Sequence, residues 1–156
     1  MYVIRTPGYS KRDPEKRWAL SDRVFFAAGA CHILAYAFLE RYGSAGRTVE
    51  WIKPAQGQTG NHHFVSSGTF AFDYHGYSSR DQLLAHYWRQ ARRHHPGWDA
   101  TLEVLPPDVL ISEAKSKTYD GLWLREPKQF LQDALPRAHA FLDRFPSPSN
   151  CRKRKD

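Results

Sequence analysis

The chain has 156 residues, 41% of them apolar and 25% charged, and carries a formal net charge of +7. This length predicts a single domain whose core is large enough to fold without disulfides or a structural metal. The two cysteines, Cys31 in an apolar stretch and Cys151 in a polar one, exclude a disulfide framework and fit a reducing compartment. The basic balance permits contact with nucleic acid, anionic lipid or an acidic protein without indicating which.

The N-terminal residues 1–17 lack the apolar region of a signal peptide. The most apolar run, Val24–Leu39, is shorter than a typical membrane-spanning helix and contains Gly29, Cys31 and His32. We therefore expect a cytoplasmic protein with no membrane span, in which this run forms part of the core.

The N-terminal part of the chain predicts only short elements. Tyr2–Arg5 is compatible with a short strand, and Pro7-Gly8 ends it. Pro14–Leu20 is compatible with a helical turn, and Ser21 or Asp22 can cap the apolar segment that follows.

The apolar segment predicts a buried helix that begins near Cys31 and ends at Gly43. Apolar residues recur at helical spacing in this segment: Ile33, Leu34, Ala37 and Phe38. A cysteine in the first helical turn lies close to unsatisfied N–H groups and partial positive charge, which favour the thiolate. The alternative is that Cys31 is only a small buried apolar residue, as free cysteines commonly are.

The middle of the chain predicts a small antiparallel sheet. Val49–Lys53 alternates as a strand that Pro54 ends, and a glycine-rich loop follows over 55–61. His62–Ser66 and Thr69–Tyr74 then flank Ser67-Gly68 as a β-hairpin, after which the chain is expected to leave the sheet at residues 75–77.

The C-terminal half predicts further helices around this sheet. Ser79 and Gln82 form a capping box at the start of a helix that runs to about His94. Its basic face carries Arg89, Arg92 and Arg93. The remaining expected elements are a strand over Thr101–Leu105, a helix over Asp108–Lys117 and a helix from Pro127 to about Phe145. We expect one α+β domain over residues 1–146 and a basic disordered tail over 147–156.

The hairpin brings an imidazole next to a carboxylate. With a two-residue turn, His62 and Asp73 are directly opposite on one face of the sheet, and His63 lies on the other face. A three-residue loop would instead place His63 on the face of Asp73. We favour His62, because it follows the glycine-rich loop directly and is therefore accessible to a substrate. A histidine oriented by a carboxylate is the arrangement of a general base, and Cys31 is the corresponding nucleophile.

The order of these residues resembles the papain-like fold in its transglutaminase-like and arylamine acetyltransferase-like branches. Those proteins place a cysteine at the start of a buried helix, a histidine on a strand and an aspartate on the next strand. The matching segments are Gly29-Ala30-Cys31, His62–Val65 and Phe72–Gly76, so the resemblance covers roughly residues 25–77. It implies a central buried helix packed on a small sheet as a papain-like or transglutaminase-like core, and acyl transfer by a peptidase, amidase, deamidase or acyltransferase.

In this hypothesis Cys31 attacks a carbonyl carbon, His62 carries the proton and Asp73 orients the imidazole. The Cys31 backbone N–H and a second donor would stabilise the oxyanion. Many papain-like enzymes carry a glutamine shortly before the cysteine, where Phe25 and Phe26 stand here. Candidates for the second donor or for substrate contact are therefore Gln56, Gln58, Asn61 and His63.

Two other classes of function are compatible with the sequence. One is a binding module without catalysis, in which the basic helix face contacts nucleic acid or an acidic protein. The other, supported only by scattered His and Tyr on short strands, is an NAD-using transferase. We expect no cofactor and no metal site, because HExxH, CxxC and HxH spacings do not occur.

Overall fold

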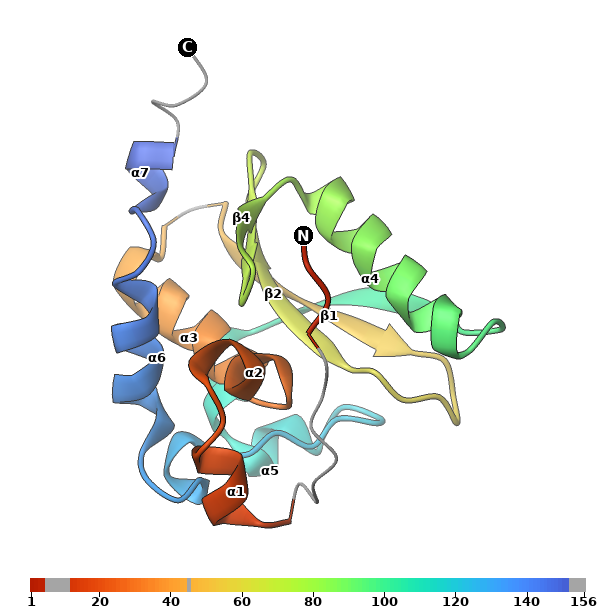
Figure 1. The fold of residues 1–156 in the computed structure, drawn as a ribbon, viewed down its shortest axis with the longest axis horizontal. Helices are drawn as coiled ribbons and strands as arrows, with labels where there is room; N and C mark the ends of the chain where they lie inside the picture. Colours follow the sequence, from red (N-terminus) through yellow and green to blue (C-terminus); the bar gives the residue numbers. More distant parts are fainter. Residues whose placement is uncertain (5–11, 45, 152–156) are drawn as a thin grey trace.

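The computed structural model describes residues 1–4, 12–44 and 46–151. They form one α+β domain built on a five-stranded antiparallel sheet with the strand order β4-β3-β2-β1-β5 (Figure 1). The strands are β1 Thr48–Pro54, β2 His62–Ser66, β3 Ala71–Asp73, β4 Gly76–Ser78 and β5 Ala100–Leu105. The predicted fold class and the small antiparallel sheet are thus confirmed.

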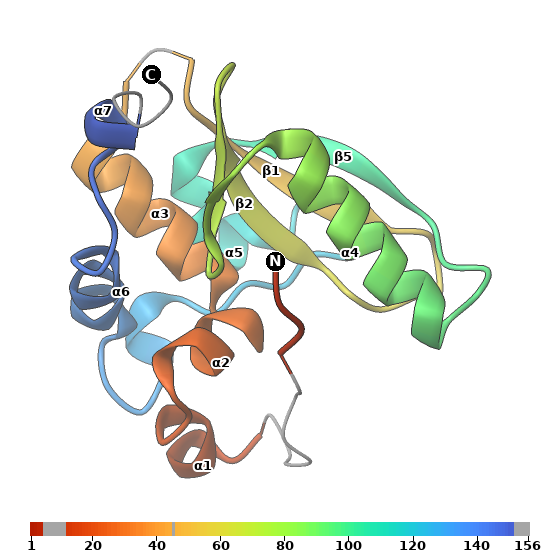
Figure 2. The ribbon, with the colours of Figure 1, turned by 45° about the horizontal axis from the view of Figure 1, so that its top comes forward.

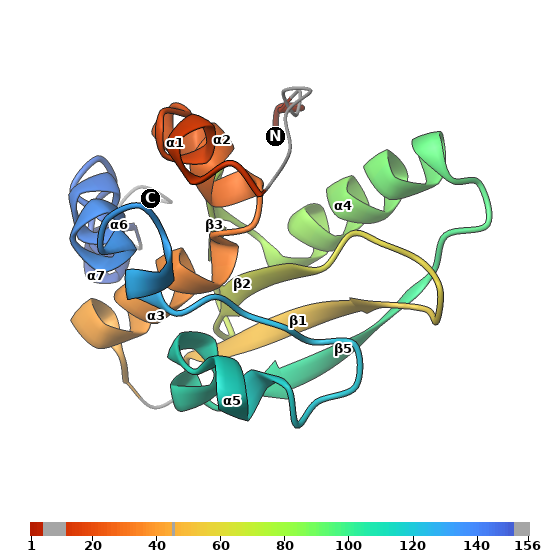
Figure 3. The same ribbon diagram turned by 90° about the horizontal axis from the view of Figure 1, so that it is seen from below.

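Helices cover both faces of this sheet. α4, Arg80–His94, packs on one face, where the buried residues are Ile52, Phe64, Ala71, Leu83 and Trp98. On the other face α3, Cys31–Tyr42, lies between the sheet and α6, Ala134–Leu142 (Figure 2). Figure 3 shows α4 and the short helix α5, Glu113–Ser116, on opposite sides of the sheet. Most of the apolar burial that stabilises the fold occurs on the α3 face.

The apolar segment before residue 42 forms two helices rather than one. α2, Asp22–Ala27, ends at Ala28, and α3 begins at Cys31. Gly29 joins them with φ of 104°, a conformation that a residue with a Cβ rarely adopts. The guanidinium of Arg17 donates a 2.9 Å hydrogen bond to the Gly29 carbonyl. This hydrogen bond is partly buried, and it holds the chain two residues before the predicted nucleophile.

The end of α3 is at the predicted residue, but for a different reason. Gly43 has φ of −61° and ψ of 127°, so it is extended rather than left-handed. A Cβ on Gly43 would lie 2.3 Å from the carbonyl oxygen of Leu39. Close approach to the preceding helical turn, and not a positive φ, therefore requires glycine here.

The prediction that the chain leaves the sheet at His75 is wrong. Asp73 pairs with Gly76, residues 74 and 75 form the turn, and β4 becomes an edge strand. Gly76 has φ of 96°, and a Cβ there would lie 2.8 Å from the ring of Phe145. A three-residue strand that begins with glycine is too short to show a period of two in the sequence.

The remaining elements agree with the predictions in part. α1 spans Pro14–Trp18, as expected for a helical turn, but no strand forms within the described residues 1–4. The predicted helix over 108–117 is a 3-10 helix, η1 Pro107–Ile111, followed by α5. In place of the predicted final helix there is a second 3-10 helix, η2 Pro127–Gln129, followed by α6. α6 starts seven residues later than expected. Pro136 lies in its first turn, where a backbone N–H has no partner within the helix, so no hydrogen bond is lost.

The C-terminal stretch contains one more helix. α7 covers Pro148–Cys151, within the stretch expected to be a basic disordered tail. Residues 152–156 of that predicted tail lie outside the described residues. Across the described ranges, no helix combines the length and the apolar character needed to cross a membrane.

Candidate active site

Cys31 is the first residue of α3, as predicted, and it is 7% exposed. The residue before the helix is Ala30, which offers no side-chain acceptor to the first N–H groups of α3. Those N–H groups and the aligned peptide dipoles of a 12-residue helix favour negative charge at this end. The thiol is thus located where a thiolate and an oxyanion are both stabilised.

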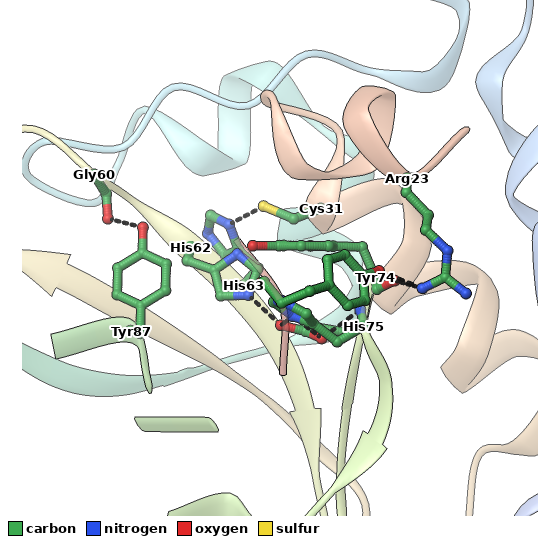
Figure 4. A network of polar contacts seen from close by, with 10 residues as sticks. Arg23, Cys31, Gly60, His62, His63, Tyr74, His75 and Tyr87 are labelled. Carbon is green, nitrogen blue, oxygen red and sulfur yellow. Dashed lines mark hydrogen bonds and ion pairs between the residues drawn. The ribbon is translucent and has the colours of Figure 1, made fainter. Parts of the chain in front are cut away.

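The sulfur of Cys31 makes its short contact with His63, and the imidazoles of His62 and His32 also act on it. The distance from Sγ to His63 Nδ1 is 3.5 Å (Figure 4). His63 pairs with Trp51 of β1, and the two rings stack with their centroids 6.3 Å apart. His63, and not the favoured base His62, makes this 3.5 Å contact, because α3 packs on the sheet face to which His63 belongs.

His62 and Asp73 form the predicted pair on the opposite face. His62 Nε2 is 3.0 Å from Asp73 Oδ2, and both side chains are almost fully buried. The hairpin pairs Val65 with Phe72, so its loop has four residues and Asp73 lies diagonally from His62 instead of directly opposite. A four-residue loop keeps both side chains on one face, as a two-residue turn would.

Asp73 has a second partner, His75, which the sequence pattern did not predict. One of its oxygens accepts a 2.8 Å hydrogen bond from the backbone N–H of His75 and lies 3.1 Å from the same residue's Nδ1. On its other side His75 Nε2 is 2.8 Å from the carbonyl oxygen of Tyr2. The only feature of the sequence that could have predicted this contact is the spacing of Asp73 and His75, because Asp side chains commonly accept a hydrogen bond from the backbone N–H two residues later.

Two tyrosines enclose His62. The ring of Tyr87, from α4, stacks on it with centroids 5.1 Å apart, and Tyr74 approaches edge-on at 5.6 Å. Tyr87 donates a 2.6 Å hydrogen bond to the carbonyl of Gly60, at the start of β2. These contacts restrict the orientation of the imidazole, which also faces Asp73.

The environment of Cys31 favours its thiolate. Burial raises the pKa of the thiol, but hydrogen bonds with three imidazoles outweigh burial and hold the pKa well below its ordinary value. These imidazoles belong to His32, His62 and His63. His32 is fixed by its own contact, because its Nε2 lies 2.8 Å from the carbonyl oxygen of Arg125.

The two neighbouring histidines differ in charge. Burial lowers the pKa of His62, but its contacts with Asp73 and Cys31 prevail and raise the pKa to about 10. Burial lowers the pKa of His63 below its ordinary value. Burial raises the pKa of Asp73, yet hydrogen bonds with His62 and His75 hold it well below the usual range. These directions favour a thiolate at Cys31, an imidazolium at His62, a carboxylate at Asp73 and a neutral imidazole at His63.

The other predicted donors, Gln56, Gln58 and Asn61, line one neighbouring cavity. The amide of Gln58 donates to the Gly97 carbonyl and accepts from the backbone N–H of Asp99, so it joins two loops. Asn61 Oδ1 accepts a 2.7 Å hydrogen bond from the indole of Trp51, which leaves the Asn61 amide nitrogen as a donor. Gln56 is exposed in the glycine-rich loop.

A cavity of about 370 Å³ lies next to this group. Its lining includes Trp51, Asn61, Gln56 and, from the loop after α5, Asp120. Cys31 and His63 are not part of its lining. Trp51 lies between the cavity and the sulfur, because it stacks on the His63 ring that contacts Cys31.

The predicted basic surface on α4 is partly used within the fold. Arg92 donates a 2.9 Å hydrogen bond to the carbonyl of Trp98 and lies 3.5 Å from Asp99. Arg93 is exposed, and Arg89 lines a second cavity, at the N-terminal segment.

Comparisons of the chain with protein-family models, with curated proteins and with solved structures found no match. Within the described part of the chain, no group of three or more His, Cys, Asp and Glu side chains has the arrangement of a metal site.

Proposed function

We propose that the protein is a cysteine-dependent acyl-transfer enzyme of the peptidase, amidase, deamidase or acyltransferase type. Cys31 is the nucleophile, His62 the general acid and base, and Asp73 the residue that orients and charges His62. One observation carries this proposal. A buried thiol at a helix N-terminus contacts an imidazole at 3.5 Å, beside an imidazole–carboxylate pair at 3.0 Å.

The proposal includes a papain-like or transglutaminase-like core. Its support is the order of the elements, in which a helix that begins with cysteine packs on an antiparallel sheet. The histidines and the aspartate follow on neighbouring strands β2 and β3.

Acylation begins from the thiolate. Cys31 Sγ attacks the carbonyl carbon of an amide or ester, forming a C–S bond and a tetrahedral oxyanion. The negative charge of Cys31 is one cause of the raised pKa of His62, so its loss on acylation lowers that pKa. The imidazolium then releases its proton to the leaving group as the bond from the carbonyl carbon to that group breaks.

Deacylation uses the same imidazole in its neutral form. His62 accepts a proton from water or from an acceptor amine, which attacks the thioester carbon. The C–S bond breaks, the thiolate returns and the imidazolium is restored. Asp73 stays ionised and holds His62 Nε2 as a donor throughout.

His63 has a separate role in this scheme. Its Nδ1 faces the sulfur, and its Nε2 is buried without a hydrogen-bond partner among the described residues. Buried polar atoms in proteins nearly always have a partner, so we assign Nε2 to a substrate group or a water. The oxyanion is stabilised by the Cys31 backbone N–H at the start of α3. The adjacent 370 Å³ cavity is the proposed place for the substrate.

Trapping the acyl-enzyme tests the proposal. With p-nitrophenyl acetate, the wild-type protein is expected to release nitrophenolate and to carry one acetyl group on the peptide that contains Cys31, removable by hydroxylamine. The matched control is Cys31→Ser, which has nearly the same volume and is expected to remain unacetylated. Acetylation of Cys151 alone, or equal nitrophenolate release by the Ser variant, would reject Cys31 as the nucleophile.

The binding-module hypothesis has less support. Of the three arginines predicted to form its surface, Arg92 is already bound to Trp98 and Asp99.

A further inference from the structure

A second cavity, of about 440 Å³, lies between the N-terminal segment, β4 and α4. The residues of its lining with polar or charged side chains are Tyr2, His75, Tyr77, Ser78, Gln82, His86 and Arg89. The Tyr77 hydroxyl donates to the carbonyl of Pro146. It borders the candidate active site through His75, whose Nδ1 binds the carboxylate of Asp73.

The cavity gathers basic groups without a carboxylate in its lining. The rings of His75 and His86 meet edge-on, with centroids 5.1 Å apart. Burial lowers the pKa of His86, and the positive charges of His75, the amino terminus and Arg89 lower it further. Asp73, which opposes this effect, is already shared by two imidazoles. The positive charge around His86 is therefore incompletely balanced within the protein.

A hydroxyl donor in the same cavity is unused. Ser78 Oγ is buried and has no hydrogen-bond partner among the described residues. Gln82 Oε1 accepts from the backbone N–H of Ser79, which leaves the Gln82 amide N–H groups as further donors. No ion pair of Arg89 occurs within residues 1–4, 12–44 and 46–151. Donors from β4 and from two turns of α4 thus surround one volume, and a buried hydroxyl ordinarily has a partner.

We propose that this cavity binds a small molecule through an oxyanion group, a phosphate or a carboxylate, held by Arg89, His86 and the hydroxyl of Ser78. Guanidinium and imidazolium groups form charge-assisted hydrogen bonds with such oxygens. The volume exceeds that of a bare ion and suits a small organic molecule. This site is independent of the chemistry proposed for Cys31.

The proposal predicts that binding takes up a proton. The groups that act on His86 are Asp73 from β3, His75 from the following turn, Arg89 from α4 and the amino terminus. A bound anion offsets the effect of His75, Arg89 and the amino terminus and therefore raises the pKa of His86. His86 is then protonated in the complex at pH values where it is neutral in the free protein. Affinity is therefore expected to fall as the pH rises from 6 to 8.

The experiment is a titration with sodium sulfate, which does not itself titrate in this range, at constant ionic strength set with sodium chloride. The expected result is a saturable shift of the His86 ring signals in NMR spectra, with proton uptake measured by calorimetry in two buffers. Arg89→Gln is expected to weaken binding by about tenfold, and Ser78→Ala to weaken it less. Separate titrations with phosphate and acetate then identify which oxyanion binds more tightly.

Arg93→Gln is the matched control, because Arg93 belongs to the same helix but does not line the cavity. It is expected to bind sulfate as the wild type does. Equal weakening by Arg89→Gln and Arg93→Gln would show general attraction to a basic helix and overturn the proposal. The same shift in chloride alone would also overturn it.

Discussion

At the scale of single residues, two adjacent histidines approach one sulfur with different charges. Neighbours on a strand point to opposite faces, so His62 joins Asp73 on one face and His63 joins Cys31 on the other. Only His62 has the carboxylate that stabilises its protonated form, and burial keeps His63 neutral. This difference assigns the proton to His62, although His63 makes the 3.5 Å contact with the sulfur.

Replacing each histidine separately tests this assignment. Hydrolysis of p-nitrophenyl acetate is expected to fall by about 10³-fold in His62→Ala, because a general acid and base is removed, and much less in His63→Ala. His94→Ala, at an exposed residue at the end of α4, is the control for loss of an imidazole outside the group around Cys31. The reverse order of effects would make His63 the base, and small equal effects would exclude both.

At the scale of elements, α3 is the part of the fold on which the site depends. Leu34 is 2% exposed, on the helix that packs between the sheet and α6. Helices α2 and α3 are separate because Gly29 turns the chain, and Arg17 holds the carbonyl of that glycine. The first turn of α3, which holds Cys31, is therefore held by the Arg17–Gly29 hydrogen bond before it and by the packing of α3 between the sheet and α6.

We expect Leu34→Ala to lower the free energy of unfolding by about 2–5 kcal/mol, since it leaves a cavity in the core. Urea denaturation measures this change. The control is Leu131→Ala, at a side chain that is 47% exposed, for which the change is expected to stay within about 0.5 kcal/mol. A comparable loss for both variants would contradict the central position of α3.

The hairpin illustrates what local sequence determines and what it does not. The strand β2, the capping box of α4 and the common face of His62 and Asp73 follow from alternation and from short-range hydrogen bonds. The length of the hairpin loop does not follow from alternation. It depends on Ser67, whose Oγ accepts hydrogen bonds from the backbone N–H groups of Thr69 and Phe70. The contact of His63 with Cys31 depends on which sheet face receives α3, and this is decided by packing between distant segments.

At the scale of the whole molecule, the charges of the site link folding to pH. Above its unfolded pKa of about 6.5, His62 keeps its proton only in the folded protein, so its contribution to stability is lost as the pH rises towards about 10. Cys31 acts in the opposite sense. Its lowered pKa means that the folded protein has released a proton that the unfolded chain keeps up to its ordinary pKa, so stability rises with pH there.

The contributions of His62 and Cys31 to the pH dependence of stability have opposite signs. They are expected to cancel from the folded pKa of Cys31, or from about pH 6.5 if that is higher, up to about pH 8.5. The wild-type free energy of unfolding should be nearly constant over this range, measured by urea denaturation. In Cys31→Ser the contribution of the thiol is absent, and Asp73 alone still raises the pKa of His62. Stability should therefore fall as the pH rises above about 6.5, with a limiting slope of about 1.4 kcal/mol per pH unit and over a narrower range than the pKa of the wild-type His62 would give. The same slope in both proteins would show that Cys31 and His62 are not an ion pair.

The central claim, that Cys31 is a thiolate held beside an imidazolium, is tested most directly by its rate of alkylation as a function of pH. Iodoacetamide reacts with the thiolate, and peptide mapping separates Cys31 from Cys151. We predict that labelling of Cys31 in the folded protein reaches its half-maximal rate well below pH 8.5, the ordinary pKa of a cysteine thiol, and that His62→Ala moves this midpoint upward. Labelling of Cys31 only after denaturation, or a midpoint at or above 8.5 in the wild type, would contradict the claim.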